Sequence, residues 1–193
     1  MTLPNKLTML RVILIPVMVA VYLLRPLALL PDYWIFFALG IIFLGASFTD
    51  YLDGFIARRD NLVTTFGKFM DPLADKLLVM TALLVLMDAS LRGVAAFWMP
   101  FWVPLLVLSR ELIVTSVRLV AIDAGKVIAA SKLGKLKTGS TMAAIGMYFL
   151  LVPLGIPFLN ILSVIVMAFA VVMTVVSGTD YLLKNRHLIF QTK

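Results

Sequence analysis

Long apolar runs dominate this sequence and constrain its fold more than any other feature. Six stretches, most of them near the length of about 20 apolar residues that an α-helix needs to cross a bilayer, follow one another with polar breaks between them. Apolar residues make up 62% of the 193 residues and charged residues only 14%, whereas a soluble domain averages about 45–50% and about 25%. We therefore expect an all-α integral membrane protein, a six-transmembrane-helix bundle that forms one domain over residues 1–193.

The expected membrane segments are 9–30, 33–57, 67–88, 94–122, a short one at 139–153, and 157–183. Residues 2–8 precede the first of them as a short interfacial segment. The N-terminal pattern of basic residues followed by an apolar run resembles a secretory signal. No small-residue cleavage site follows it, however, and Arg25-Pro26 interrupts the run, so we interpret it as an uncleaved first helix.

Charged residues alternate between the connections. Most basic residues cluster at the two termini and after the second and fourth segments, whereas the opposite face carries Arg25 and Arg92 beside Asp32 and Asp88. The positive-inside rule then puts both termini in the cytoplasm, and with no transit peptide we expect a bacterial-type cytoplasmic membrane. The net charge of +7 suits membrane lipids of an anionic leaflet or an anionic substrate. We expect no nucleic-acid partner, because nucleic-acid binders show basic patches on a polar surface.

Two pairs of aspartates stand out within the apolar runs. Asp50 and Asp53 are three residues apart and Asp71 and Asp75 are four apart, so each pair lies on one face of its helix. Counted inward from the cytoplasmic boundary at ~1.5 Å per residue, both pairs lie about 6–12 Å deep. Because a short loop joins these antiparallel segments, we expect four carboxylates to meet at one level near the cytoplasmic side.

Four facing carboxylates need a compensating charge. Placing each carboxylate in the membrane costs roughly 2.5–3.5 kcal/mol at the midplane and less at this depth. If the aspartates were only polar residues tolerated near a helix end, nothing would offset their mutual repulsion. An all-oxygen ligand set selects hard ions, so we expect Mg²⁺ or Mn²⁺, with ligands enough for two ions that clamp a phosphate. The chain has no cysteine and one histidine, His187 in the polar tail, so thiolate sites are excluded. Gly54 and Gly67 would let backbone or ligand approach closely, although helix packing through small residues explains them equally well.

These residues resemble the signature of the CDP-alcohol phosphotransferase family, D-x-x-D-G-x-x-A-R-x8-G-x3-D-x3-D. The sequence fits every fixed position from Asp50 to Asp75, and its six-helix layout is similar to that of the family along essentially the whole chain. The resemblance implies that a CDP-linked lipid binds with its diphosphate on a two-metal centre. It also implies that an acceptor hydroxyl attacks the phosphorus next to the lipid, that CMP leaves, and that the protein is a homodimer.

The resemblance further implies roles for single residues. Asp50, Asp53 and Asp71 would be the main metal ligands, while Asp75 would bind metal and act as the general base for the acceptor hydroxyl, a role for which it needs only hydrogen-bond reach. The residues expected to contact the CDP-lipid are Asn5, Thr8, Gly54, Arg58 and Gly67. For Asn5 and Thr8 a helix-cap role is supported equally well.

A second polar cluster indicates the acceptor. Arg110 and Arg118 are eight residues apart, about 80° around the helix, so both can line one broad face. Arg110 lies some 20 Å from the cytoplasmic helix end, where it needs a partner or a wet cavity. Glu111 is a candidate partner, although adjacent helix residues point in different directions. Lys135 and Lys137 follow in the next basic run, and together with the two arginines they suit an acceptor that carries phosphate. A simpler interpretation of the two lysines is that they belong to a positively charged cytoplasmic loop.

The segments around Arg110 and Lys135, with the opening Pro-Asn-Lys-Leu-Thr-Met-Leu-Arg, also resemble the branch of the family that makes phosphatidylglycerophosphate. That resemblance implies transfer of a phosphatidyl group from CDP-diacylglycerol to sn-glycerol 3-phosphate, whose phosphate Arg110, Arg118, Lys135 and Lys137 would hold. Two alternatives stay open. One is another branch of the family, with inositol phosphate, serine or phosphatidylglycerol as acceptor. A neutral or zwitterionic acceptor would leave the two arginines without a role. The other is a divalent-cation transporter, disfavoured because the sequence has no inverted repeat.

Overall fold

The computed structural model describes residues 3–27, 30–59, 65–94, 98–123, 125, 126, 128 and 131–189. Within these ranges the side chains of residues 3, 4, 51, 53, 55, 57, 58, 65, 66, 68, 123 and 187–189 are not among those described. Every regular element in this part of the chain is a helix, which confirms the all-α expectation. The order is α1 (Leu3–Leu23), η1 (Arg25–Leu27), α2 (Asp32–Arg59), α3 (Thr65–Leu91), α4 (Trp102–Asp123), α5 (Lys132–Leu150), η2 (Val152–Leu154) and α6 (Pro157–Ile189).

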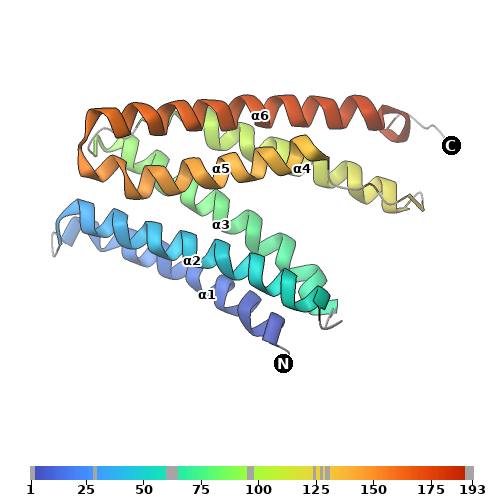
Figure 1. Ribbon diagram of the computed structural model, residues 1–193, viewed down its shortest axis with the longest axis horizontal. Coiled ribbons are helices and arrows are strands. Elements are labelled where there is room, and N and C mark those ends of the chain that lie inside the picture. The colour runs from blue at the N-terminus through green and yellow to red at the C-terminus, as the bar shows by residue number, and fades with distance from the viewer. Residues whose placement is uncertain are drawn as a thin grey trace.

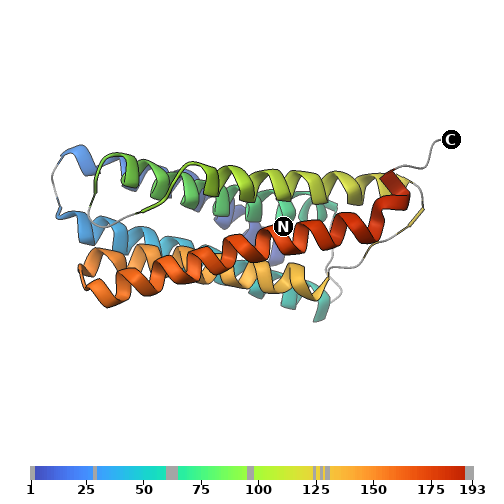
Figure 2. The same cartoon turned by 90° about the horizontal axis from the view of Figure 1, so that it is seen from above.

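The long helices run back and forth along one axis. The turns that lead from α1 to α2 and from α5 to α6 lie at one end of the bundle, and both termini lie toward the other (Figure 1). Seen from above, the helices stay roughly aligned with that axis (Figure 2). α1 packs against α2 and α3, α5 packs against α6 and α2, and α4 packs against α6 and α3. α3 therefore connects the α1–α2 pair with the α4–α6 side, which is where the polar residues gather.

The first helix is longer at its start and shorter at its end than expected. α1 already begins at Leu3, so the described part of residues 2–8 continues the helix instead of forming a separate interfacial segment. α1 ends at Leu23, well before residue 30. The reason is that Arg25 precedes Pro26, and a residue before proline is disfavoured in the α conformation.

α4 and α5 also differ from the expected segments 94–122 and 139–153. α4 begins only at Trp102. The preceding helix α3 ends at Leu91, and Gly93 turns the chain there with a left-handed φ of 65°. α5 begins at Lys132, inside the basic run that suggested a loop. Ser131 caps this helix by accepting a hydrogen bond from the backbone N–H of Gly134 at 3.0 Å.

Small residues let α2 and α5 pack closely. A Cβ atom on Gly40 would lie 2.6 Å from Cδ2 of Leu150, and one on Gly146 would lie 3.3 Å from Cδ2 of Leu44. Such close approach through glycines is a common way for membrane helices to associate, since van der Waals contact replaces the hydrophobic effect there.

Large apolar side chains cover the outside of the bundle as well as filling its core. Leu91 and Phe158 are 73% and 70% exposed, an arrangement that suits lipid rather than water. Three helices of the described part contain windows long and apolar enough to cross a membrane, within Asn5–Leu27, Asp32–Asp50 and Pro157–Arg186. The others, α3 to α5, carry the charged side chains described below, which lowers their mean hydropathy.

At the turn end of the bundle, five polar residues form what we call the Asp88 cluster: Tyr22, Arg25, Asp32, Asp88 and Arg92. Arg25 pairs with Asp32 at 2.8 Å and Arg92 pairs with Asp88 at 2.6 Å. Tyr22 donates a hydrogen bond to Asp88 at 2.6 Å. The hydrogen-bonded carboxylate of Asp88 raises the pKa of the Arg92 guanidinium. These residues line a cavity of about 350 Å³ and tie α1, the start of α2 and the end of α3 together.

Candidate active site

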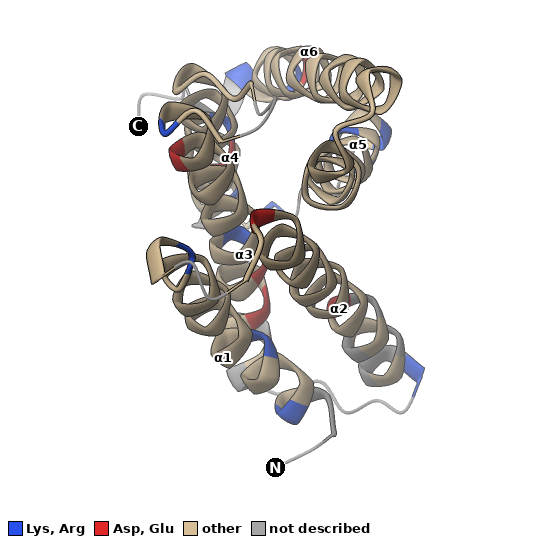
Figure 3. Cartoon of the chain, turned by 90° about the vertical axis from the view of Figure 1, so that its left-hand side faces the viewer, with Lys and Arg blue, Asp and Glu red and all other residues tan. Residues whose placement is uncertain are grey.

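Three of the four expected metal ligands have described side chains, and they lie on two helices that pack together. Asp50 is on α2, and Asp71 and Asp75 are on α3. The charge of Asp50 is near enough to repel those of both other carboxylates. In Figure 3, red acidic segments of α3 lie between α1 and α2. Asp53 lies on α2 one turn further along, but its side chain is outside the described residues.

α1 contributes two side chains to this group of aspartates. The hydroxyl of Thr8 donates a hydrogen bond to Oδ1 of Asp71 at 2.6 Å. Arg11, whose side chain is 0% exposed, places Nη1 2.9 Å from Oδ1 of Asp50 and donates from Nε to the carbonyl oxygen of Ala46. In the sequence Arg11 is one of the basic residues near the N-terminus, and this contact was not predicted. An arginine three residues after Thr8 shares a helix face with it, and that spacing was the available signal.

The donor set of this group fits a hard divalent ion. Carboxylate oxygens on α2 and α3 are the ligands that Mg²⁺ and Mn²⁺ prefer. Among the side chains that the structure describes, no three acidic or histidine residues form a group that could hold a metal ion. That search did not include Asp53, so the expected four-aspartate set stays a prediction.

The residues expected to contact the CDP-lipid lie around the same group. Asn5 and Thr8 are inside α1, which begins at Leu3, so neither is the N-cap of that helix and the cap alternative is wrong. Gly54 is half-buried in α2 and Gly67 is buried in α3. The side chain of Arg58 lies outside the described residues.

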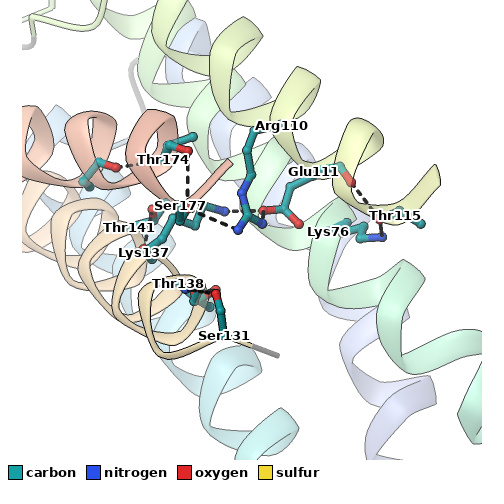
Figure 4. Close-up of polar contacts among 12 residues, drawn as sticks. Lys76, Arg110, Glu111, Thr115, Ser131, Lys137, Thr138, Thr141, Thr174 and Ser177 are labelled. Atoms are coloured by element: carbon teal, nitrogen blue, oxygen red, sulfur yellow. Dashed lines mark hydrogen bonds and ion pairs between the residues drawn. The ribbon is translucent and has the colours of Figure 1, made fainter. Parts of the chain in front are cut away.

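The second cluster is held together by one carboxylate (Figure 4). Arg110, 12% exposed, donates from Nη1 to Oε1 of Glu111 at 3.1 Å and from Nη2 to the hydroxyl of Ser177 at 3.2 Å. The ammonium group of Lys137 also donates to Oε1 of Glu111. Glu111 is therefore a partner of Arg110 although the two residues are adjacent, because the long arginine side chain reaches back to it.

Two glycines make room for the side chain of Arg110. A Cβ atom on Gly178 of α6 would lie 3.1 Å from Cγ of Arg110, and one on Gly134 of α5 would lie 3.6 Å from its Nη2. The contact at Gly178 is tighter than ordinary van der Waals contact, so a larger residue there would push the side chain of Arg110 by a few tenths of an ångström, whereas the contact at Gly134 is an ordinary one.

A polar cavity of about 500 Å³, which we call the basic cavity, lies between α3, α4, α5 and α6. Its lining includes Asp75 together with Arg110, Arg118 and Lys135. Lys137 instead lines a neighbouring, mostly apolar cavity of about 220 Å³, which Asp75 also borders. The structure thus brings three of the four expected acceptor residues to one cavity with the expected base, and it places Lys137 beside that cavity.

Two further residues of the basic cavity escaped the sequence analysis. Lys76 follows Asp75 directly, lines both cavities and donates a hydrogen bond to the hydroxyl of Thr115 at 2.6 Å. Tyr181 of α6 also lines the basic cavity, and the guanidinium carbon of Arg118 lies 5.8 Å from the centre of its ring. The position of Lys76 beside an intramembrane aspartate was a usable sequence signal. No sequence signal indicated Tyr181, because the residues that it contacts are distant from it in the sequence.

An apolar helical bundle with carboxylates and a basic cavity at one end is typical of a membrane-embedded enzyme that handles phosphate groups. Residues 1–176 match the family described as CDP-alcohol phosphatidyltransferase, and the chain belongs to this family. The resemblance inferred from the aspartate signature is thereby confirmed. Members of the family are membrane-bound and generally depend on divalent metal.

Several bacterial proteins are similar to this chain. A CDP-diacylglycerol–glycerol-3-phosphate 3-phosphatidyltransferase of Bacillus subtilis (strain 168) is 39% identical, over 95% of this chain and 94% of its own length. The protein of the same name from Escherichia coli (strain K12) is 40% identical, over 74% of this chain and 73% of its own length. A probable phosphatidylglycerophosphate synthase of Mycobacterium tuberculosis (strain ATCC 25618 / H37Rv) is 46% identical, over 72% of this chain and 62% of its own length.

Proposed function

We propose that this chain transfers the phosphatidyl group of CDP-diacylglycerol to sn-glycerol 3-phosphate, giving phosphatidylglycerophosphate and CMP. The names of the similar bacterial proteins support this reaction. The observation that carries the proposal is the basic cavity, whose lining combines Asp75 with Arg110, Arg118 and Lys135. A cavity with a carboxylate at one side and guanidinium and ammonium groups at the other suits an acceptor that has a hydroxyl and a phosphate.

The chemistry is the one that the family resemblance implies. The primary hydroxyl oxygen of the acceptor attacks the phosphorus next to the diacylglycerol, and the bond from that phosphorus to the oxygen bridging it to the cytidine monophosphate breaks. CMP leaves with the bonding electron pair, and the hydroxyl proton passes to the carboxylate of Asp75. Arg110, Arg118 and Lys135 fix the acceptor by its phosphate, so that its far hydroxyl reaches Asp75.

We assign the metal ligands to Asp50, Asp53, Asp71 and Asp75, with two Mg²⁺ or Mn²⁺ ions. When bound, such ions offset the charge of the diphosphate and of the carboxylates around it. The contacts of α1 support this assignment, because Arg11 and Thr8 already stabilise Asp50 and Asp71 as anions. Asn5, Thr8, Gly54, Arg58 and Gly67 would contact the CDP-lipid.

We place all six helices in a bacterial cytoplasmic membrane, as one domain with both termini and the site on the cytoplasmic side. The charge alternation between the connections supports this orientation, and the exposed apolar side chains support burial in lipid. We further propose that the protein works as a homodimer among membrane lipids, as the family resemblance implies.

The proposal is tested by supplying purified protein with CDP-diacylglycerol, Mg²⁺ and one candidate acceptor at a time, and by following CMP release. We expect release with sn-glycerol 3-phosphate and at most trace release with inositol phosphate, serine or phosphatidylglycerol. Release with inositol phosphate but not with glycerol 3-phosphate would assign the chain to another branch of the family. Release with none of them, together with Mn²⁺ flux across vesicles, would favour the transporter interpretation.

A further inference from the structure

Tyr181 is buried at the edge of the basic cavity. It lies on α6 and is 3% exposed, and its ring packs against Val114 and Val117 of α4. The same residue lines the basic cavity together with Arg118 and Arg110. Its ring is therefore fixed by apolar packing next to the cationic side chains that we assign to the acceptor.

The hydroxyl of Tyr181 has no hydrogen-bond partner among the described residues. The hydroxyls of two other buried tyrosines are paired: Tyr148 donates to the carbonyl oxygen of Trp98 at 2.9 Å, and Tyr22 donates to Asp88. Buried polar atoms without a partner are rare, because desolvating a donor or acceptor without replacing its hydrogen bond is unfavourable. Because Tyr181 also lines the basic cavity, its orphaned hydroxyl points to a ligand atom bound there.

A second orphaned donor belongs to the same cavity. Nε of Arg110 is buried and has no hydrogen-bond partner in the described part of the chain, although both terminal nitrogens of that guanidinium are engaged. Arg118 is exposed and lines the cavity, and cation–π attraction holds its guanidinium near the ring of Tyr181. Two unpaired donors and a nearby guanidinium match a group with several acceptor oxygens and negative charge, which describes a phosphate.

We infer that Tyr181 is a specificity-determining residue whose hydroxyl donates a hydrogen bond to the phosphate of the acceptor. This inference rests on the proposed function, and it adds a neutral donor to the cations that we assign to the acceptor phosphate. Phosphate oxygens accept hydrogen bonds from such a donor more strongly than neutral oxygens do, since the acceptor is charged.

Tyr181→Phe tests the inference because it removes the hydroxyl and keeps the ring, its packing and its contact with Arg118. We expect the KM for glycerol 3-phosphate to rise about 10-fold or more, in line with the loss of a hydrogen bond to a charged group. We expect kcat and the KM for CDP-diacylglycerol to change by less than about twofold, since neither involves this hydroxyl. The melting temperature without acceptor should not fall, because the change removes an unpaired buried polar group.

Tyr148→Phe is the matched control. Its hydroxyl is buried and paired with Trp98, away from the basic cavity. This variant should show a lower melting temperature and an unchanged KM for the acceptor. If Tyr181→Phe behaves in the same way as Tyr148→Phe, the hydroxyl of Tyr181 is structural and the inference is wrong.

Inorganic phosphate identifies the group that Tyr181 contacts. As a competitor of glycerol 3-phosphate, it should inhibit Tyr181→Phe about 10-fold less strongly than the wild type. A raised KM with unchanged inhibition by phosphate would place the hydroxyl at the glycerol part of the acceptor and overturn the assignment. Absence of wild-type CMP release with glycerol 3-phosphate would instead refute the proposed function, so the two failures are distinguishable.

Discussion

The two ends of the bundle carry charged side chains beside a cavity, but they pair these charges differently. In the Asp88 cluster, Arg25 pairs with Asp32, and Arg92 pairs with Asp88. At the other end Arg11 pairs with Asp50, and Arg110 and Lys137 pair with Glu111. The carboxylate of Asp50 there still lies near enough to Asp71 and Asp75 to repel both. The wall of the basic cavity there keeps two polar atoms without a partner in the described part of the chain, one on Arg110 and one on Tyr181.

This difference separates a structural cluster from a functional one. A folded protein normally satisfies its buried polar groups internally, as the Asp88 cluster largely does with its ion pairs and with the hydroxyl of Tyr22. An end of the bundle that keeps like charges together and leaves hydrogen-bond donors unpaired is less stable than it could be, unless a ligand supplies the missing charges and acceptors. We therefore assign the chemistry to the end that contains Asp75. The end that contains Asp88 has a structural role, in which it ties the helices together.

Removal of divalent metal should have the largest effect. Without metal, the pairing of Arg11 with Asp50 offsets only part of the charge of the aspartates and none of that of the diphosphate, so we expect chelation to abolish CMP release, and Mg²⁺ or Mn²⁺ to restore it. Direct Mn²⁺ binding, measured by electron paramagnetic resonance, should be weakened by Asp50→Asn. Asp32→Asn, at the other end, should leave Mn²⁺ binding unchanged. Equal weakening by both variants would contradict the placement of the metal.

Asp75→Asn should lower kcat by about 10²–10⁴-fold, the usual contribution of a general base. Binding of CDP-diacylglycerol should be largely retained, because Asp50, Asp53 and Asp71 remain. The control is the same chemical change at the other end, Asp88→Asn, which we expect to lower the melting temperature and leave kcat within about twofold. Near-normal turnover of Asp75→Asn would remove that residue from the role of base.

Arg118→Ala should raise the KM for glycerol 3-phosphate by roughly 10- to 100-fold, as expected for losing a charged hydrogen-bond donor to phosphate. The KM for CDP-diacylglycerol should stay nearly constant. Arg92→Ala removes another exposed arginine, from the Asp88 cluster, and should change neither KM. If Arg118→Ala weakened only the CDP-lipid, the acceptor pocket would be misplaced.

Gly178→Ala should have the smallest effect. The added methyl group would lie 3.1 Å from Cγ of Arg110 and push the guanidinium by a few tenths of an ångström, so we expect the KM for the acceptor to rise only about two- to fivefold. Gly139→Ala is the control: Gly139 also lines the basic cavity, but an added Cβ would meet nothing within 4 Å. An equal effect of both changes would show that Arg110 does not depend on the space at Gly178.

The sequence was sufficient for features that depend on spacing along one helix. The apolar runs predicted an all-helical membrane protein, and the aspartate spacing carried the family signature that the comparison with known proteins confirmed. The segment boundaries were less accurate, because local signals decide them. Pro26 shortens α1, and Ser131 starts α5 inside a basic run that hydropathy alone assigns to a loop.

Contacts between distant helices could not be predicted in this way. The guanidinium of Arg11 meets Asp50 on another helix, a contact that was not predicted. The contact of Lys137 with Glu111, at the wall of the apolar cavity, was not predicted either, and its role at the acceptor phosphate stays a prediction. The role of Tyr181 depends on how α4 packs against α6, which no periodicity within either helix encodes.

The central claim is that the end of the bundle with Asp75 joins a CDP-linked lipid to a phosphorylated acceptor. The most direct measurement reconstitutes the protein in vesicles that contain CDP-diacylglycerol and supplies glycerol 3-phosphate labelled in its glycerol carbons. We predict that the label enters the lipid extract in a one-to-one ratio with released CMP, and that Asp75→Asn stops both while Asp88→Asn stops neither. Release of CMP without label in the lipid, or label incorporation that survives Asp75→Asn, would contradict the account.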